Sequence, residues 1–240
     1  MSNTITIRDA TLDDGDFILG AFDSAIEYLP TIGSADQWGP ELFSKRRGGS
    51  STQEMSTVVK SSVVHTAHQA AHPDELYGAS RGEGDNGEGL LHARVLIAES
   101  KVAGEEEQQQ TSSRPVAVLA YQDFVPAHLA AHPDFRPSAE AINAREGSYI
   151  YVWALVSDFR AGHAARKGAG QALLRETLRI AKKHGVAWMY VDCWTGNERR
   201  LVQYYERQGF KLVKDFLFEK PDGSIWPGSL LEIDMAKHDA

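Results

Sequence analysis

Two glycines and two basic residues stand together at one junction of the chain and could bind an anion. The segment RKGAGQ, residues 166–171, follows a strand-like run and precedes a stretch with helical periodicity. Gly168 and Gly170 would let the backbone approach a ligand closely, and Arg166 and Lys167 add positive charge. The first amides of the following helix have no partner inside that helix. The junction therefore suggests a phosphate site, although the same glycines could simply shape a turn.

Two familiar phosphate motifs can be tested against this segment directly. A P-loop needs the pattern GxxxxGK[ST], and neither GKS nor GKT occurs in the chain. A dinucleotide-binding loop needs a third glycine at the position that Leu173 occupies. Neither a nucleoside triphosphate nor a dinucleotide site is predicted here.

The elements around the junction follow from hydrophobic periodicity and turn residues. Alternating or continuous apolar runs predict seven strands, and stripes at helical spacing predict helices between them. The fold class that follows is α/β (α+β), with a mixed, mostly antiparallel central sheet of about seven strands flanked by helices. The predicted strands are Thr4–Ala10, Leu91–Ser100, Pro115–Phe124, Ser148–Val156, Val186–Trp194, Phe210–Phe218 and Ser229–Met235, and the predicted helices are Leu12–Leu29, Ser51–Ala71, Gln171–Gly185 and one after Asn197.

Length and composition favour one domain over residues 1–240. Three polar or Gly- and Pro-rich segments, near 72–90, 101–114 and 125–147, are expected to be loop insertions, the last with room for one short helix. Cys193 is the only cysteine, so no disulfide can form within the chain, and no metal site is expected. A net charge of -8 and the lack of a long apolar run argue against nucleic-acid and membrane partners, and a cytoplasmic location is expected.

A second motif downstream narrows the interpretation of the glycines. In the segment VDCWTGNERRLVQYYERQGFKLV a strand ends at Trp194, Asn197 could cap a helix, and Tyr205 precedes the pair Gly209-Phe210. Together with RKGAGQ, this segment resembles the GCN5-related N-acetyltransferase superfamily, whose members share a glycine-rich acetyl-CoA loop, an Asn and a Tyr-x-x-x-Gly-Phe ending. The resemblance is strong over about 148–213 and weaker toward the N-terminus.

The resemblance implies an acetyl-CoA site with named contacts. The strand end would pair with the pantetheine arm, and the loop amides would bind the pyrophosphate. The family usually has Arg or Gln where this chain has Ala165, so Arg166 or Lys167 must supply the positive charge. The implied cofactor-binding residues are Val156, Ser157, Arg166, Lys167, Gly168, Ala169, Gly170, Gln171, Asn197 and Tyr204.

The resemblance also implies roles in proton transfer. Tyr205 takes the position of the general acid, since an ordinary tyrosine is neutral at pH 7 and could protonate the leaving thiolate; it could also be an ordinary packing residue. Asp123, Asp158 and Asp192 end strands and are candidate bases, of which Asp192 is chosen, with a water relay as the alternative. The expected acceptor pocket is lined by Trp38, Tyr121, Asp123, Trp153 and Trp194.

The implied activity is direct transfer of acetyl from acetyl-CoA to a primary amine of a small molecule, in a ternary complex and without a metal. Two alternatives stay open at this point. One is acetylation of a protein or peptide N-terminus or lysine, and the other is an acyl-CoA-binding module without catalysis. The chain is expected to act as a monomer or homodimer.

Overall fold

The computed structural model describes residues 3–73, 93–102, 113–145, 148–220 and 223–238. Most of the expected insertions at 72–90 and 101–114 lies outside these residues. No helix among the described residues is long and apolar enough to cross a membrane.

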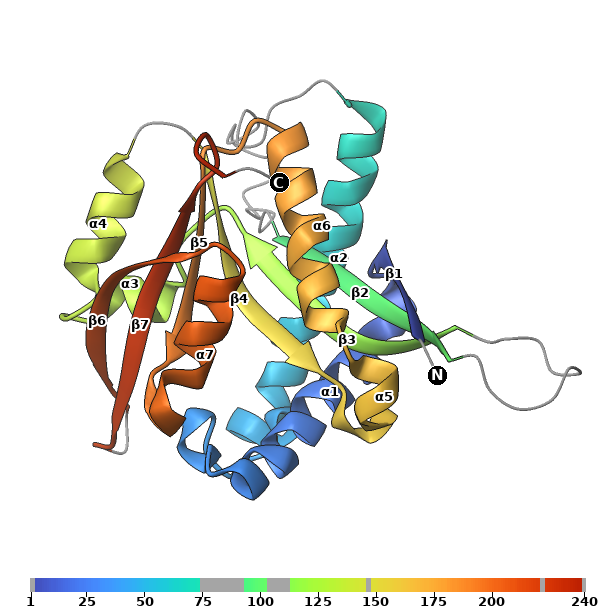
Figure 1. The fold of residues 1–240 in the computed structure, drawn as a ribbon, viewed down its shortest axis with the longest axis horizontal. Helices are drawn as coiled ribbons and strands as arrows, with labels where there is room; N and C mark the ends of the chain where they lie inside the picture. Colours follow the sequence, from blue (N-terminus) through green and yellow to red (C-terminus); the bar gives the residue numbers. More distant parts are fainter. Residues whose placement is uncertain (1–2, 74–92, 103–112, 146–147, 221–222, 239–240) are drawn as a thin grey trace, which may run out of the picture. The chain divides into compact units, whose positions relative to one another are not determined.

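The described strands form one seven-stranded sheet in the order β1-β2-β3-β4-β5-β7-β6 (Figure 1). β4 and β5 are parallel, whereas β1 with β2, β5 with β7 and β6 with β7 are antiparallel. The expected mixed sheet is therefore confirmed. The strands are β1 (Asn3–Asp9), β2 (Ala93–Val102), β3 (Arg114–Gln122), β4 (Tyr149–Ser157), β5 (Trp188–Trp194), β6 (Lys211–Glu219) and β7 (Ile225–Asp234).

Helices follow the periodic stretches of the sequence closely. The apolar stripe of α6 is buried from Leu173 to Ala181, and Gly185 follows the helix with a φ of 67°, the left-handed conformation of a glycine that ends a helix. The helices are α1 (Gly15–Tyr28), α2 (Ser50–Ala71), α3 (Ala127–Ala131), α4 (Arg136–Ala144), α5 (Gly162–Arg166), α6 (Ala169–Lys183) and α7 (Gly196–Arg207). Short 3-10 turns lie at Leu12–Asp14, Leu29–Ile32, Ala35–Gln37, Phe43–Gly49 and Phe159–Ala161.

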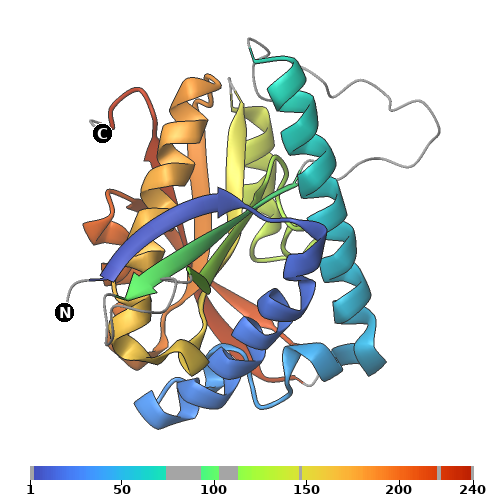
Figure 2. The same ribbon diagram turned by 90° about the vertical axis from the view of Figure 1, so that its right-hand side faces the viewer.

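The chain divides into two compact units, and each draws on separate parts of the sequence. Among the described residues, unit 1 comprises residues 3–73, 93–102, 113–120 and 154–177, and unit 2 comprises residues 121–145, 148–153, 178–220 and 223–238. In unit 1, β1 pairs along β2 in the register Asn3 to Val102 and Asp9 to Leu96 (Figure 2). The hydroxyl of Ser62 on α2 accepts a hydrogen bond from the Val95 amide of β2 at 2.8 Å, which fixes the helix to this strand.

Unit 2 corrects one expectation about its own segment. Within residues 125–145, two helices form where a loop with one short helix was expected, because α3 and α4 bury Leu129, Phe135 and Ile142. These side chains pack with Tyr151 of β4 and with Phe216 of β6, among others, in one hydrophobic cluster. The sequence shows only three prolines and no sustained period here, so the apolar contacts that stabilise such short helices were not visible in it.

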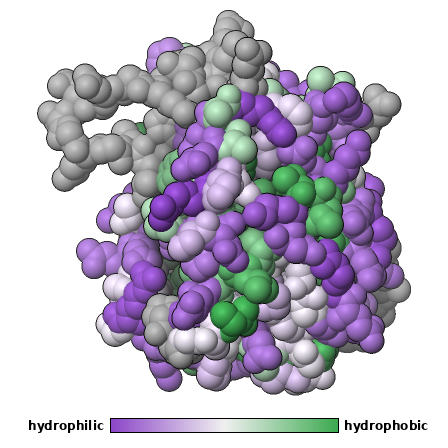
Figure 3. Space-filling view, turned by 90° about the vertical axis from the view of Figure 1, so that its left-hand side faces the viewer, coloured by the Kyte–Doolittle hydropathy of each residue, from purple (hydrophilic) through white to green (hydrophobic). Residues whose placement is uncertain are grey.

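The outer surface of unit 2 keeps apolar residues in contact with solvent. Figure 3, which faces the side of α4 and β6, shows hydrophobic residues scattered among polar ones. β6 is the last strand of the sheet and exposes Leu212, Val213 and Leu217 by 44%, 44% and 53%.

Candidate active site

In unit 1, the end of β4 leads directly into the glycine junction. Val156 is buried and Ser157 is half-buried at the strand end, and the chain then passes through a 3-10 turn and α5. Gly168 has a φ of 83°, a left-handed conformation that side chains other than glycine adopt with strain. Its carbonyl accepts the Ala172 amide at 2.9 Å, so α6 starts immediately after it. The predicted strand and helix are confirmed, but the predicted loop 166–171 is shorter than expected, because Arg166 ends α5 and α6 already begins at Ala169. Helix α5 was not predicted.

The loop residues differ in how far they reach solvent. Asn3 of β1 donates its side-chain amide to the carbonyls of Ala165 and Lys167 at 2.9 and 3.1 Å, which fixes the backbone just before the glycine. Of the predicted pyrophosphate contacts, Lys167 and Gly168 are exposed, Arg166, Gly170 and Gln171 are half-buried, and Ala169 is buried.

Arg166 carries a positive charge that no carboxylate of the described residues binds. Its guanidinium lies 4.1 Å from the ring centre of Phe159 and 5.5 Å from that of Tyr28, and these two rings stack on each other at 3.9 Å. Within the described part of the chain it forms no ion pair, and its Nε is buried without a hydrogen-bond partner. Arg160, by contrast, is bound to Asp158 at 2.8 and 3.0 Å. Arg166 is thus held by aromatic packing and is free to meet an anion.

Helix α1 supports this segment, which the sequence did not reveal. The hydroxyl of Ser24 accepts the Phe159 amide at 3.0 Å and lies 3.2 Å from Oδ1 of Asp158. One turn further, Tyr28 makes the stack with Phe159. Spacing of four residues puts Ser24 and Tyr28 on one helix face, but a polar and an aromatic residue at that spacing look like any helix stripe.

In unit 2, the pairing between β4 and β5 ends before the strands do. Partners run from Tyr149 with Trp188 to Val152 with Val191, yet both strands continue beyond these rungs. Beyond Val191, the backbone N–H and C=O groups of β5 that face β4 are therefore not paired with β4 and can bind other partners. Such an unpaired strand edge can take up an extended ligand by backbone pairing.

Asp192 lies on β5 one residue past the last paired rung. Its Oδ1 accepts a hydrogen bond from the Tyr151 hydroxyl at 2.7 Å, and Tyr151 is fully buried. Although the residue keeps some exposure, burial of the carboxyl group raises the pKa of Asp192 to about 6, because the hydrogen bond from Tyr151 only partly offsets the loss of solvation. Burial, and then the charge of Asp192, raise the pKa of Tyr151 well above its ordinary value. A carboxylate of this kind can accept a proton near neutral pH.

Tyr205 lies on the other side of β5. Residues alternate along a strand, so Asp192 and Cys193 point to opposite faces. The charges of Arg199 and Glu206 on α7 act on the pKa of the Cys193 thiol, which puts α7 on the Cys193 side. Tyr205 is 6% exposed and contacts Phe210 at a ring distance of 5.5 Å. Burial raises the pKa of Tyr205 well above its ordinary value, so the hydroxyl is protonated at pH 7, which is the state that a general acid needs.

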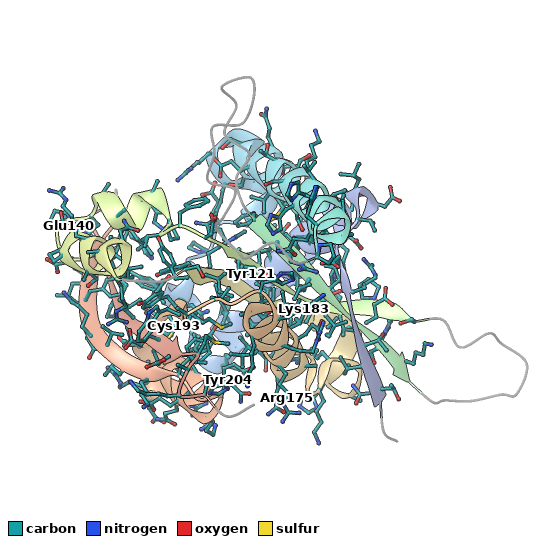
Figure 4. The ribbon with its side chains drawn as sticks, turned by 90° about the horizontal axis from the view of Figure 1, so that it is seen from above. Tyr121, Glu140, Arg175, Lys183, Cys193 and Tyr204 are labelled. Atoms are coloured by element: carbon teal, nitrogen blue, oxygen red, sulfur yellow. The ribbon has the colours of Figure 1, made fainter. Side chains whose placement is uncertain are left out.

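The neighbours of Tyr205 differ from it in exposure. Tyr204 is half-buried, and burial raises its pKa. Figure 4 labels Tyr204 and Cys193 in this unit. Cys193 is buried, and burial raises the pKa of its thiol to about 12, which makes it a poor nucleophile.

The start of α7 has a conformation that the sequence did not predict. Asn197, Glu198 and Arg199 have φ values of 49°, 57° and 59°, so three successive residues form a left-handed turn. Asn197 is therefore not the helix cap expected of it; Thr195 occupies the N-cap position. Left-handed residues cost on the order of 1–2 kcal/mol each, which contacts elsewhere must offset.

One side chain of that turn is bound to two strands. Arg199 makes a double hydrogen bond to the carboxylate of Asp215 on β6, at 3.0 and 3.0 Å, and a further one to the Ser229 hydroxyl of β7 at 3.2 Å. Ser229 in turn donates to Asp215, and the hydrogen bonds from Arg199 and Ser229 lower the pKa of that carboxyl. This network holds the turn that precedes both tyrosines.

The predicted acceptor residues do not all share one place. In unit 1, Trp38 stacks on Phe22 at 5.5 Å and is half-buried. In unit 2, Tyr121 and Asp123 are buried at and after the end of β3. Trp153 and Trp194 share the β4–β5 face with Asp192, by strand alternation from the paired rungs. Their roles stay predictions.

Gly196 is needed for space rather than for conformation. A Cβ at this position would lie 2.0 Å from Cζ2 of the Trp194 indole, which is itself 7% exposed. We expect Gly196→Ala to lower the free energy of unfolding by about 1–3 kcal/mol, because a buried ring must move. Urea unfolding would measure the change. Gly15→Ala, where no atom lies within 4 Å, is the matched control and should be near neutral; an equal loss in both variants would contradict the steric explanation.

Groups of three or more His, Cys, Asp or Glu that could hold a metal do not occur among the described residues.

Comparisons of sequence find no relative for this chain. A scan against protein-family models gives no match, and a search of curated proteins gives none either.

Comparison of structure finds many similar folds. NAA60 of Arabidopsis thaliana, in complex with acetyl-CoA, has a TM-score of 0.54 at 13% identity, over 97% of this chain and 99% of that one. The yncA protein of Salmonella typhimurium with its cofactor acetyl-CoA gives 0.51 at 14% identity, over 98% and 96% of the two chains. An N-acetyltransferase from Staphylococcus aureus gives 0.51 at 14% identity, over 97% and 99%. The protein has the fold of the GCN5-related N-acetyltransferases, as the resemblance of its motifs predicted.

Proposed function

We propose that this protein is an acetyl-CoA-dependent N-acetyltransferase that transfers acetyl to a primary amine of a small molecule. The observation that carries the proposal is Arg166, a cation packed on two aromatic rings beside Gly168 and the start of α6, to which no carboxylate of the described residues is bound. A free cation, a left-handed glycine and a helix start are what a pyrophosphate group requires. The fold and two similar structures with acetyl-CoA support the same cofactor.

In the proposed cofactor site, the strand end at Val156 and Ser157 pairs with the pantetheine arm. An amide of this strand end polarises the thioester carbonyl. The pyrophosphate is bound by the loop amides and by Arg166, with Lys167 exposed beside it. The remaining proposed contacts are Ala169, Gly170, Gln171, Asn197 and Tyr204.

In the proposed reaction, the amine nitrogen attacks the thioester carbonyl directly. Asp192 takes the proton that the ammonium must lose, directly or through water, and Tyr205 gives a proton to the departing thiolate. These two groups lie on opposite faces of β5, whose edge is unpaired past Val191. That placement suits a thioester that is approached from one face and leaves toward the other.

A small acceptor is supported by the segment between β3 and β4. Helices α3 and α4 pack on the sheet face that carries Tyr151, the hydrogen-bond partner of Asp192. This cover leaves less room than an open groove would, which disfavours a large protein substrate. A single domain over 1–240, a monomer or homodimer, a cytoplasmic location and the lack of a metal or nucleic-acid partner remain parts of the proposal.

The cofactor assignment is tested by removing the charge of Arg166 while keeping most of its apolar stem. We expect Arg166→Met to raise the Kd for acetyl-CoA about tenfold, measured by calorimetry, because a charge-assisted hydrogen bond is lost. Affinity should also depend less on salt, since one ion contact is gone.

Two further variants make this test specific. Lys167→Met shows whether the neighbouring cation shares the role. Arg175→Met is the matched control, since Arg175 is exposed and projects outward from α6 (Figure 4). Unchanged affinity in Arg166→Met, or an equal loss in Arg175→Met, would contradict the assignment. Release of CoA thiol in the presence of primary amines tests the activity itself.

A further inference from the structure

Two tryptophan side chains of unit 2 have buried hydrogen-bond donors without acceptors. The Nε1 atoms of Trp153 and Trp194 are both buried, and neither has a partner among the described residues. Trp194 as a whole is 7% exposed. Buried indole N–H groups nearly always find an acceptor, because an unmet donor costs as much as a lost hydrogen bond. Two such donors on neighbouring strands require an explanation.

Both tryptophans belong to the same sheet face as the buried carboxylate. Val152 is opposite Val191 in the last paired rung, so Trp153 and Asp192 follow immediately on their strands. Trp194 is two residues beyond Asp192 and returns to the same face. Tyr151, two residues before Trp153, confirms the shared face by its hydrogen bond to Asp192.

The charges and donors on this face are complementary to a particular kind of molecule. Asp192 has Tyr151 as its only side-chain hydrogen-bond partner and forms no ion pair within the described part of the chain. With a pKa of about 6 it is mostly ionised at pH 7 and attracts a cation. The two indoles can only donate, so they attract an oxygen acceptor.

We infer that the acceptor substrate is an α-amino carbonyl compound: its ammonium binds at Asp192, and its carbonyl or carboxylate oxygen accepts from the indoles of Trp153 and Trp194. The inference rests on the proposed function and adds the substrate class. It excludes polyamines and lysine side chains, which have no oxygen beside the amine. Free amino acids, their amides and peptide N-termini all share the required chemistry.

The first test reads the indole groups directly and needs no turnover. In a ¹H–¹⁵N spectrum of the protein bound to CoA, the Trp153 and Trp194 resonances are assigned with the Trp153→Phe and Trp194→Phe variants. Alaninamide should shift both resonances, and isopropylamine, which has the same amine on a similar carbon but no carbonyl, should shift neither. Equal shifts with both amines, or none with alaninamide, would overturn the inference and leave water as the partner of the donors.

The second test measures specificity. Trp194→Phe keeps the ring and removes the donor, so kcat/KM for alaninamide should fall about tenfold per free amine, with little change for isopropylamine. Trp188→Phe, on the same strand, is the control for folding, along with the unfolding midpoint and the acetyl-CoA Kd of each variant. Equal losses for both amines would overturn the inference.

Further amines distinguish free amino acids from peptide N-termini, and their outcomes separate the inferred substrate class from the proposed transferase activity. Alanine, alaninamide and an alanyl dipeptide compare free amino acids with peptide N-termini. If isopropylamine reacts as well as alaninamide, the inferred class is wrong while the transferase activity stands. If no amine releases CoA although alaninamide shifts the indoles, the binding site is supported and the proposed activity fails.

Discussion

Replacing Asp192 by asparagine is expected to lower kcat/KM by about 100-fold or more and to remove the acidic limb of its pH profile. The wild-type limb should have its midpoint near pH 6, because a base must be ionised to accept a proton and the pKa of Asp192 is about 6. Asparagine keeps an oxygen that can accept from Tyr151, so the local geometry is retained. Initial rates between pH 5 and 9 would measure both effects.

The other strand-end carboxylates provide the comparison for this variant. Asp123→Asn and Asp158→Asn remove buried carboxylates that the sequence also offers as bases. If Asp123→Asn or Asp158→Asn loses the acidic limb of the pH profile and Asp192→Asn retains it, the general base is that other aspartate. A limb that persists in all three variants would point to a water relay.

Stability supplies a second readout for Asp192. Its pKa is raised on folding from 3.8 to about 6, so the folded state binds the proton more tightly than the unfolded state does. The protonated carboxyl of Asp192 therefore adds to the free energy of unfolding below pH 4, and this stabilisation is lost as the pH rises through 6. At pH 7 we expect Asp192→Asn to be more stable by on the order of 2 kcal/mol, with a flatter dependence between pH 4 and 6 in urea unfolding. An equal pH dependence of stability in the wild type and in Asp192→Asn would show that burial does not raise the pKa of this carboxyl.

The second large effect is expected at Tyr205. Tyr205→Phe should lower kcat by about 100-fold or more while the Kd for acetyl-CoA stays within about twofold, because a general acid acts on the leaving group in the transition state. Single-turnover rates with acetyl-CoA and an amine, together with calorimetry, would separate the two quantities. The buried hydroxyl, with its pKa well above the ordinary value, stays protonated over the working pH range.

Tyr204→Phe is the matched control, since it removes a hydroxyl one residue away. Tyr204 is half-buried and is proposed to contact the cofactor, so its loss should change Kd more than kcat. The reverse pattern would make Tyr204 the acid. If neither variant changes kcat, water protonates the thiolate and Tyr205 is a packing residue that contacts Phe210.

Contacts at the start of α7 position the buried Tyr205. Three left-handed residues precede it, and Arg199 fastens them to Asp215 and Ser229. A helix that begins with strain needs such anchors, and the anchors come from β6 and β7, later in the sequence. The position of Tyr205 therefore depends on strands that follow it.

Local patterns in the sequence were enough to predict the strands, the long helices and the motifs. The stripe of α6, the period of α2 and the apolar runs of the strands are local patterns, and burial follows them because each needs one face away from water. The glycine at 168 was recognisable because its left-handed conformation is a requirement of that one residue. The link from RKGAGQ through Asn197 to Tyr205 was also readable, since it depends only on residue type and spacing.

The charge environment of Arg166, the pKa of Asp192 and the short helices between β3 and β4 could not be predicted, because each depends on residues distant in sequence. Arg166 became a free cation only when Tyr28 and Phe159 stacked beneath it and Asp158 bound Arg160 instead. The elevated pKa of Asp192 comes from burial of its carboxyl group, and its partner Tyr151 is 41 residues away. The helices within 125–144 depend on an apolar face supplied by other strands. Spacing along a chain records local geometry, whereas charge state and helix formation in weak segments depend on what the fold packs against them.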